Sequence, residues 1–149
     1  MAKILYLEDE KWQIEHSVCT RLEIEFGHEI TIVKNLKDAI AILNHVDFDV
    51  IIVDIMLNPR NPITYETSGF ALLSRLLKED SGKGTNALKY RVVVATGVLD
   101  KSATSLDGSR ISVANGLAAL GIADKQCVKK PFSAEELNDA ISIALHNGA

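Results

Sequence analysis

Four short runs of consecutive apolar residues constrain the fold of this chain more than any other feature. They are Ile4–Leu7, Val50–Val53, Val92–Ala95 and the shorter Cys127–Val128. Because polar residues do not alternate with the apolar ones, each run suits a strand that is covered on both faces, as in a parallel sheet. A fifth and more amphipathic run, Glu29–Val33, suits an edge strand. The sequence therefore predicts five strands.

Apolar residues between these runs recur at helical spacing, which predicts helices with one buried face. The stripes are Ile14, Val18, Cys19, Leu22 and Phe26; Leu36, Ala39, Ile40 and Leu43; Phe70, Leu73, Leu76 and Leu77; Val113, Leu117 and Leu120; and Leu137, Ala140, Ile141, Ala144 and Leu145. Ser133 to Glu136 fits a capping box at the start of the last helix. Alternating strands and helices predict an α/β fold, with an open, doubly wound parallel sheet and helices on both faces.

The length of 149 residues and the charge balance narrow the functional classes. We expect a single domain, because a second one does not fit this length. The net charge is -4 and no basic run is present, which argues against a direct nucleic-acid partner. The first apolar run is too short for a signal peptide or a membrane span. Two widely separated cysteines, Cys19 and Cys127, suggest neither a disulfide scaffold nor a metal site, so we expect a cytoplasmic protein without a membrane partner.

Polar side chains follow four of the five predicted strands. Glu8 and Asp9 come after the first strand, Asp54 after Val50–Val53, Thr96 after Val92–Ala95 and Lys130 after the last strand. The carboxyl ends of parallel strands meet at one edge of the sheet, where open α/β folds bind their ligands. We therefore expect these residues, which are distant in sequence, to converge at one site.

The chemistry of these side chains indicates a cation and a phosphoryl group. Two carboxylates about 4 Å apart repel each other by roughly 4 kcal/mol at an effective dielectric constant near 20, so Glu8, Asp9 and Asp54 together require a compensating cation. Mg²⁺ prefers one or two carboxylates, water and phosphate oxygens. An aspartate carboxylate can also attack phosphorus, while a lysine such as Lys130 and a hydroxyl such as Thr96 offset charge on the phosphoryl oxygens.

This ordered set of motifs resembles the receiver domain of two-component response regulators. The resemblance rests on Glu8-Asp9, Asp54, Thr96-Gly97 and Lys130-Pro131-Phe132, and it covers essentially the whole chain, residues 1–149. It implies a flavodoxin-like, five-stranded sheet of order 2-1-3-4-5 and a stand-alone receiver without an output domain. It also implies a signalling module rather than an enzyme with a separate substrate.

The resemblance further implies a role for each site residue. Asp54 would accept a phosphoryl group from a phosphohistidine donor. Mg²⁺ would be held by Glu8, Asp9, Asp54 and the backbone carbonyl of Met56. Lys130 would pair with the phosphoryl group. Thr96 would swing toward it and transmit its presence to the neighbouring surface.

The implied partners are proteins. A histidine kinase or a histidine phosphotransfer protein would act upstream and a protein effector downstream. The receiver itself would be a monomer or a phosphorylation-dependent dimer. The sequence does not identify the cognate kinase or the effector.

Several positions differ from the family pattern and leave alternatives open. Cys127 stands where the family has a switch aromatic residue, and the connections Ile55–Ser68 and Gly97–Arg110 are long. These differences admit a second hypothesis, a receiver-like binding module that does not use phosphate. A metal-dependent phosphatase is less favoured, because Met56 occupies the place where such enzymes have a second aspartate. Since Met56 and Val98 are apolar and cannot orient water, we expect slow self-dephosphorylation.

Overall fold

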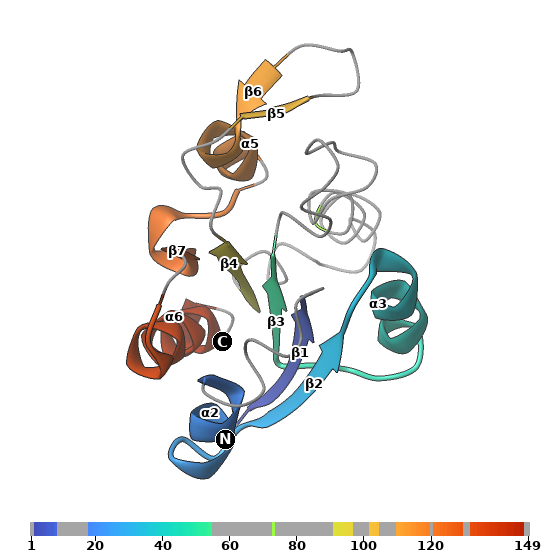
Figure 1. The fold of residues 1–149 in the computed structure, drawn as a ribbon, viewed down its shortest axis with the longest axis vertical. Coiled ribbons are helices and arrows are strands. Elements are labelled where there is room, and N and C mark those ends of the chain that lie inside the picture. Colours follow the sequence, from blue (N-terminus) through green and yellow to red (C-terminus); the bar gives the residue numbers. More distant parts are fainter. Residues whose placement is uncertain are drawn as a thin grey trace.

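The structure, a computed structural model, contains a five-stranded parallel sheet. It describes residues 2–8, 18–54, 73, 91–96, 102–104, 110–119, 121–129 and 132–147. The strands are β1 (Lys3–Leu7), β2 (Glu29–Val33), β3 (Val50–Val53), β4 (Val92–Thr96) and β7 (Cys127–Lys129). Their spatial order is β2-β1-β3-β4-β7 (Figure 1). Since β7 is the fifth strand of this sheet along the chain, the predicted fold class and the order 2-1-3-4-5 are confirmed.

The burial of each strand follows from its place in the sheet. The central strand β1 pairs with β2 on one side and β3 on the other, and its residues from Ile4 to Leu7 are buried. All four residues of β3 are buried as well. By contrast, β2 is exposed at Glu29 and only partly buried after it, as expected for the predicted edge strand. Continuous apolar runs therefore mark the interior strands, and the amphipathic run marks the edge.

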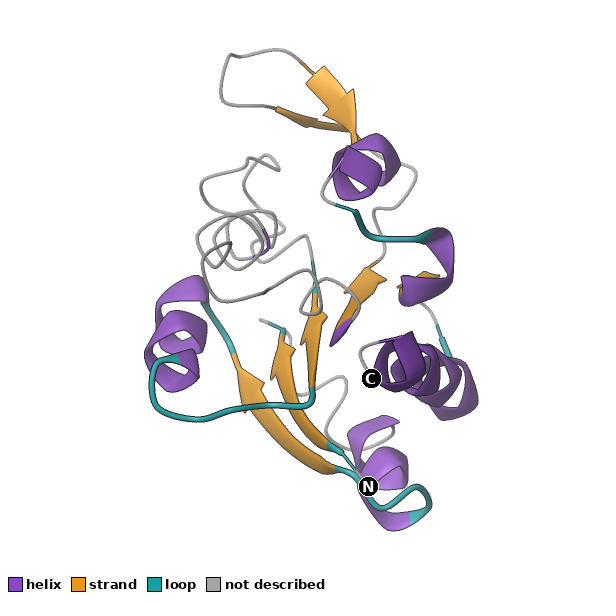
Figure 2. Cartoon of the chain, turned by 180° about the vertical axis from the view of Figure 1, so that it is seen from behind, coloured by secondary structure: helices purple, strands orange, loops and turns teal. Residues whose placement is uncertain are grey.

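Helices cover both faces of the sheet (Figures 1 and 2). The described helices are α2 (Thr20–Ile24), α3 (Leu36–Leu43), α5 (Val113–Ala119) and α6 (Ala134–Asn147), with a short 3-10 turn, η4 (Asp124–Gln126). In Figure 1, α3 lies on one face of the sheet and α2 and α6 lie on the other, whereas α5 lies beyond the end of the sheet. One core cluster joins α2 and α6 to the sheet through Leu22, Leu137 and Ile141, packed on Ile4, Tyr6 and Ile52. Within the described residues, no helix is both long and apolar enough to cross a membrane.

The predicted helices agree with the structure wherever it describes them. The Leu36–Leu43 stripe forms α3 over that range, and Leu117 is buried on α5. Of the stripe predicted from Phe70 to Leu77, Leu73 is helical and buried, and the other members lie outside the described residues. Ile14 and Leu120, which the sequence assigns to the first and fourth helices, also lie outside the described residues.

The predicted capping box at the start of α6 is present. The backbone N–H of Glu136 donates to Ser133 Oγ at 3.1 Å, and the backbone N–H of Ser133 donates to Glu136 Oε1 at 3.2 Å. These two bonds satisfy amide groups that the first turn of a helix leaves without a partner. They fix the start of α6 just after the Lys130-Pro131-Phe132 motif.

The segment after β4 differs from the prediction of a long polar connection. It contains two short antiparallel strands, β5 (Ser102–Thr104) and β6 (Arg110–Ser112), and α5 begins directly after β6. In Figure 1 this pair lies beyond the end of the main sheet, next to α5. Strands of three residues are too short to show an alternating pattern. The dipeptide Asp107-Gly108 between them is a common hairpin signal that could have indicated the pair.

Candidate functional site

Glu8 and Asp54 lie at neighbouring positions on the carboxyl edge of the sheet. The parallel hydrogen-bond ladder continues one residue past each strand: the Glu8 N–H donates to the Val33 carbonyl at 2.9 Å, and the Asp54 N–H donates to the Leu7 carbonyl at 3.1 Å. Because Leu7 pairs with Val53, the next residues, Glu8 and Asp54, follow side by side. The structure thus brings together two of the predicted site residues, which are far apart in sequence.

Both acidic side chains are buried. Glu8 is 0% exposed and Asp54 is 3% exposed. Within the described part of the chain they are the only buried carboxylate residues. Burying a carboxylate is costly unless opposite charge or hydrogen bonds compensate for it, and two adjacent carboxylates also repel each other. A pair of hard oxygen donors of this kind suits a hard divalent cation such as Mg²⁺.

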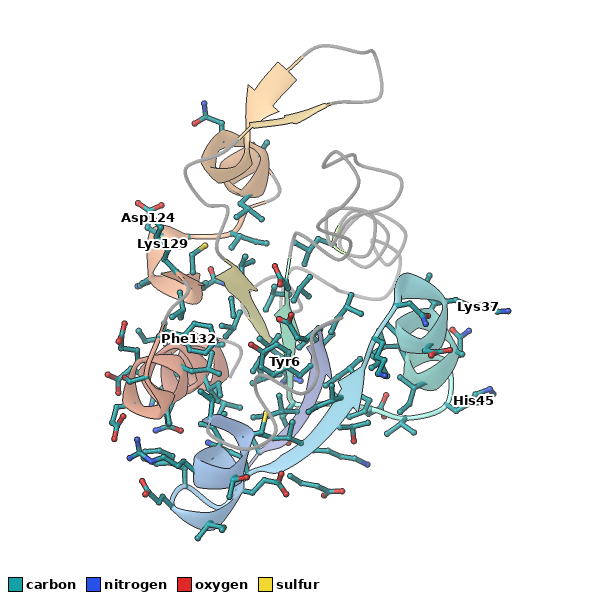
Figure 3. The ribbon with its side chains drawn as sticks, viewed as in Figure 1. Tyr6, Lys37, His45, Asp124, Lys129 and Phe132 are labelled. Carbon is teal, nitrogen blue, oxygen red and sulfur yellow. The ribbon has the colours of Figure 1, made fainter. Side chains whose placement is uncertain are left out.

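Tyr6 lies directly below this pair of acids on the same face of the sheet. It precedes Glu8 by two positions on β1 and pairs with Ile52, which precedes Asp54 by two positions on β3. Side chains two residues apart on a strand point to the same face. Figure 3 shows Tyr6 in the interior of the protein. The phenol is 0% exposed, and its hydroxyl has no hydrogen-bond partner among the described residues.

The environment of Tyr6 keeps its hydroxyl protonated. Burial, followed by the negative charge of Glu8 and then by Cys19 and Asp54, raises the pKa of Tyr6 well above its ordinary value. The phenol is therefore a neutral group close enough to both carboxylates to feel their charge. Tyr6 is not among the site residues that the sequence motifs predict. The signal was a single polar group, the phenol, within the otherwise aliphatic run Ile4–Leu7.

Thr96 ends β4 at the same edge of the sheet. Its Cα partner is Lys129, the last residue of β7, and β4 lies next to β3. The side chain of Thr96 is not among those described, and Asp9, Met56 and Lys130 lie outside the described residues. In the part that is described, no three metal-ligating side chains form a group. The structure thus juxtaposes Glu8, Asp54 and the backbone of Thr96, and the roles of the full set stay predictions.

Cys127, for which the resemblance implies a switch position, has the properties of a packing residue. It is partly buried, and its thiol lies 3.7 Å from the Ala123 carbonyl. Burial and the nearby charge of Asp124 raise the pKa of Cys127 to about 11. A thiol in this state carries little thiolate near neutral pH and reacts slowly.

Comparison with known proteins identifies structural relatives of the whole chain. Over 100% of both chains it is similar to the receiver domain of the Francisella response regulator 1452, with 26% identity and a TM-score of 0.67. It is also similar to the beryllofluoride-activated NtrC4 receiver domain dimer, with 22% identity, a TM-score of 0.68, and coverage of 99% of this chain and 98% of that one.

A longer protein shares the same unit. NtrX from Brucella abortus matches 99% of this chain with 25% identity and a TM-score of 0.69, but the match spans only 27% of NtrX. No protein-family model and no curated protein matches the sequence. The resemblance to response regulator receiver domains that the sequence motifs predicted is confirmed at the level of structure.

Proposed function

We propose that this chain, which has the fold of response regulator receiver domains, accepts a phosphoryl group on Asp54 and signals through changed protein contacts. In this reaction a carboxylate oxygen of Asp54 forms a bond to phosphorus as the P–N bond of a phosphohistidine donor breaks. The bonding electron pair stays on the ring nitrogen of the donor histidine. Residues 1–149 act as one receiver unit in this proposal.

The observation that carries the proposal is the placement of Asp54 beside Glu8 at the carboxyl edge of a receiver-type sheet. Both side chains are buried, at 3% and 0% exposure. Buried carboxylates require compensating positive charge or hydrogen bonds, and a bound cation would supply positive charge to both of them. The receiver domain of the Francisella regulator, similar over its entire length, supports the same interpretation.

Mg²⁺ fits the residues present at this edge. Glu8 and Asp54 would hold it, together with Asp9 and the backbone carbonyl of Met56. A bound Mg²⁺ supplies positive charge that offsets the negative phosphoryl oxygens as they approach the carboxylates. The side chain of Asp54 serves as the nucleophile, and Glu8 maintains the negative charge that attracts the cation.

Two further residues complete the proposed site. Lys130 pairs with the phosphoryl oxygens, and the hydroxyl of Thr96 donates a hydrogen bond to them. The pairing of Thr96 with Lys129 supports this assignment, because it puts the ends of β4 and β7 side by side. Movement of Thr96 toward the phosphoryl group would then alter the surface formed by the segment that follows β4.

The proposed partners follow from this chemistry. A histidine kinase or a histidine phosphotransfer protein supplies the phosphoryl group, and a protein effector recognises the phosphorylated surface. We place the protein with signalling modules, since the group it accepts remains on its own side chain.

The test is phosphorylation of the purified chain with acetyl phosphate and Mg²⁺. We expect one acid-stable and base-labile adduct, which peptide mass spectrometry locates on Asp54 and which Asp54→Asn does not form. Asp49→Asn is a matched control, because Asp49 is exposed and lies just before β3, at the opposite edge of the sheet. It should be phosphorylated like the wild type.

Absence of any adduct with acetyl phosphate and with phosphohistidine proteins would contradict the proposal. That result would favour a receiver-like binding module that works without phosphate. The presence of Cys127 at the position of the family's switch aromatic residue supports this second function.

A further inference from the structure

The hydroxyl of Tyr6 is the one buried polar side-chain atom, within the described residues, that no hydrogen bond satisfies. A buried hydroxyl without a partner costs free energy, and such groups in native proteins call for an explanation. Tyr6 belongs to a strand whose other buried positions are aliphatic. A phenylalanine would fill the same volume without that cost, so packing alone does not explain the oxygen.

The register of β1 and β3 determines where this hydroxyl lies. Tyr6 and Ile52 are Cα partners, and Glu8 and Asp54 occupy the next positions on the same face toward the carboxyl edge. Tyr6 packs in the cluster that α2 and α6 form on this face, which closes it off from solvent. Its hydroxyl is thus buried on the face of the sheet that also carries Glu8 and Asp54, and it cannot obtain a hydrogen bond from bulk water.

We propose that Tyr6 is a positioning residue of the Glu8–Asp54 site, whose hydroxyl hydrogen-bonds to this carboxylate pair, directly or through a cation-bound water, when the pair holds a divalent cation. A phenol can donate one hydrogen bond and accept others, so it can serve a carboxylate oxygen and a water molecule alike. Groups that orient metal ligands from behind raise metal affinity, and their loss typically weakens binding by about 10- to 100-fold.

This inference rests on the proposed function, because it assumes that Glu8 and Asp54 bind a divalent cation. It adds a residue that touches neither the phosphoryl group nor, necessarily, the cation. It also predicts an unusual combination of effects. The oxygen of Tyr6 should cost stability in the cation-free protein and favour the cation-loaded one.

The experiment compares the wild type with Tyr6→Phe and Ile52→Val. Tyr6→Phe removes one oxygen and keeps the ring. Ile52→Val is the matched control, since it trims the cross-strand partner of Tyr6, two positions before Asp54, and removes no polar group. Two quantities are measured for each protein: the Mg²⁺ dissociation constant by calorimetric titration, and the urea midpoint of unfolding in EDTA.

We expect Tyr6→Phe to bind Mg²⁺ about tenfold more weakly than the wild type. Its urea midpoint in EDTA should be equal to or higher than that of the wild type, because the variant no longer buries an unsatisfied hydroxyl. Ile52→Val should show the opposite combination, with a lower midpoint and wild-type Mg²⁺ affinity.

Two results would contradict the role of Tyr6 and leave the proposed cation site intact. One is an equal Mg²⁺ affinity of Tyr6→Phe and the wild type. The other is a fall in the EDTA midpoint of Tyr6→Phe, which would show an ordinary structural hydrogen bond. If the wild type bound no Mg²⁺ in calorimetry, the cation site itself would be refuted, and the role of Tyr6 with it.

Discussion

Thr96 on β4 is the Cα partner of Lys129 on β7, so the last residues of these two strands lie side by side at the carboxyl edge of the sheet. In the strand order β1-β3-β4-β7, Asp54 at the end of β3 lies between Glu8 at the end of β1 and Thr96 at the end of β4. The phosphoryl group proposed for Asp54 would therefore lie between the strand end that carries Glu8 and the strand end that carries Thr96.

The first prediction concerns the hydroxyl of Thr96. We expect Thr96→Val to accept the phosphoryl group on Asp54 about 10- to 100-fold more slowly, since a hydrogen bond to a charged oxygen contributes about 1.5–3 kcal/mol. The response of the segment after β4 should be lost. Amide NMR spectra with and without phosphorylation measure that response, and Thr96→Ser, which keeps the hydroxyl, should retain it. An unchanged response in Thr96→Val would contradict the proposed role.

A second prediction concerns the reactivity of Cys127. Burial and Asp124 raise the pKa of this thiol to about 11, from a reference of 9.0. In a Cys19→Ala background, we expect Cys127 to react with a disulfide reagent at pH 8 at least about a hundredfold more slowly than free cysteine. The rate should rise about tenfold with each pH unit and level off only above about pH 11. Asp124→Asn should speed the reaction modestly, because it removes the second cause of the raised pKa.

The same raised pKa has a consequence for stability. The folded state holds the Cys127 proton more tightly than the unfolded chain does. This contribution to stability is therefore fully present below about pH 9 and is lost as the pH rises toward about 11. Rapid labelling of the folded protein at pH 8 would rule out both expectations.

The third prediction concerns Gln126, a buried amide that links β4 to the turn before β7. Its Nε2 donates to the Val92 carbonyl at 2.9 Å, and its Oε1 accepts from the Ala123 N–H at 2.9 Å. Gln126→Leu leaves both backbone groups without these bonds, which we expect to lower the free energy of unfolding by about 2–4 kcal/mol. Urea unfolding measures the change, and Lys125→Leu at the exposed neighbouring position is the control. A loss below about 1 kcal/mol would show that Gln126 is not the link.

Sequence reasoning predicted the sheet because its signal is the continuity of apolar residues. β3 has the predicted bounds Val50–Val53, β1 begins one residue earlier than predicted, and β2 lies at the edge as its amphipathic pattern indicated. The juxtaposition of Glu8 and Asp54 follows from the parallel order of strands, which places all carboxyl ends together. The parallel sheet and its functional edge were therefore predictable from periodicity, whereas the strand order came from the resemblance to receiver domains.

The missed features depend on contacts that periodicity does not encode. The pair β5–β6 has only three residues per strand, which is too few for a pattern. Gln126 is buried because a turn carries it under β4, and the sequence shows only a polar residue between Lys125 and Cys127. Tyr6 counts as apolar in a run of hydrophobic residues. Its relation to the site becomes visible only in the strand register, which places Tyr6 on the same face of the sheet as Glu8 and Asp54.

The last prediction concerns the electrostatic cost of the site and uses Glu8→Gln. Without a cation, two carboxylates placed side by side at this edge repel each other, and two unit charges about 4 Å apart at an effective dielectric constant near 20 repel by roughly 4 kcal/mol. Replacing Glu8 by a neutral amide removes this repulsion, but the amide must still satisfy its own hydrogen bonds. We therefore expect the free energy of unfolding in EDTA to rise by only about 1–2 kcal/mol.

Magnesium should reverse the order of the two proteins. A cation that binds only the folded state stabilises it in proportion to the logarithm of its concentration over the dissociation constant. The wild type should therefore gain stability on addition of millimolar Mg²⁺, and Glu8→Gln should gain little. Glu29→Gln is the control, because Glu29 is exposed at the amino end of β2, whereas Glu8 lies beside the carboxyl end of that strand. This variant should behave like the wild type in both conditions. If Glu8→Gln were less stable than the wild type in EDTA, the carboxylate would be bound by a stronger internal partner than the cation proposed for it.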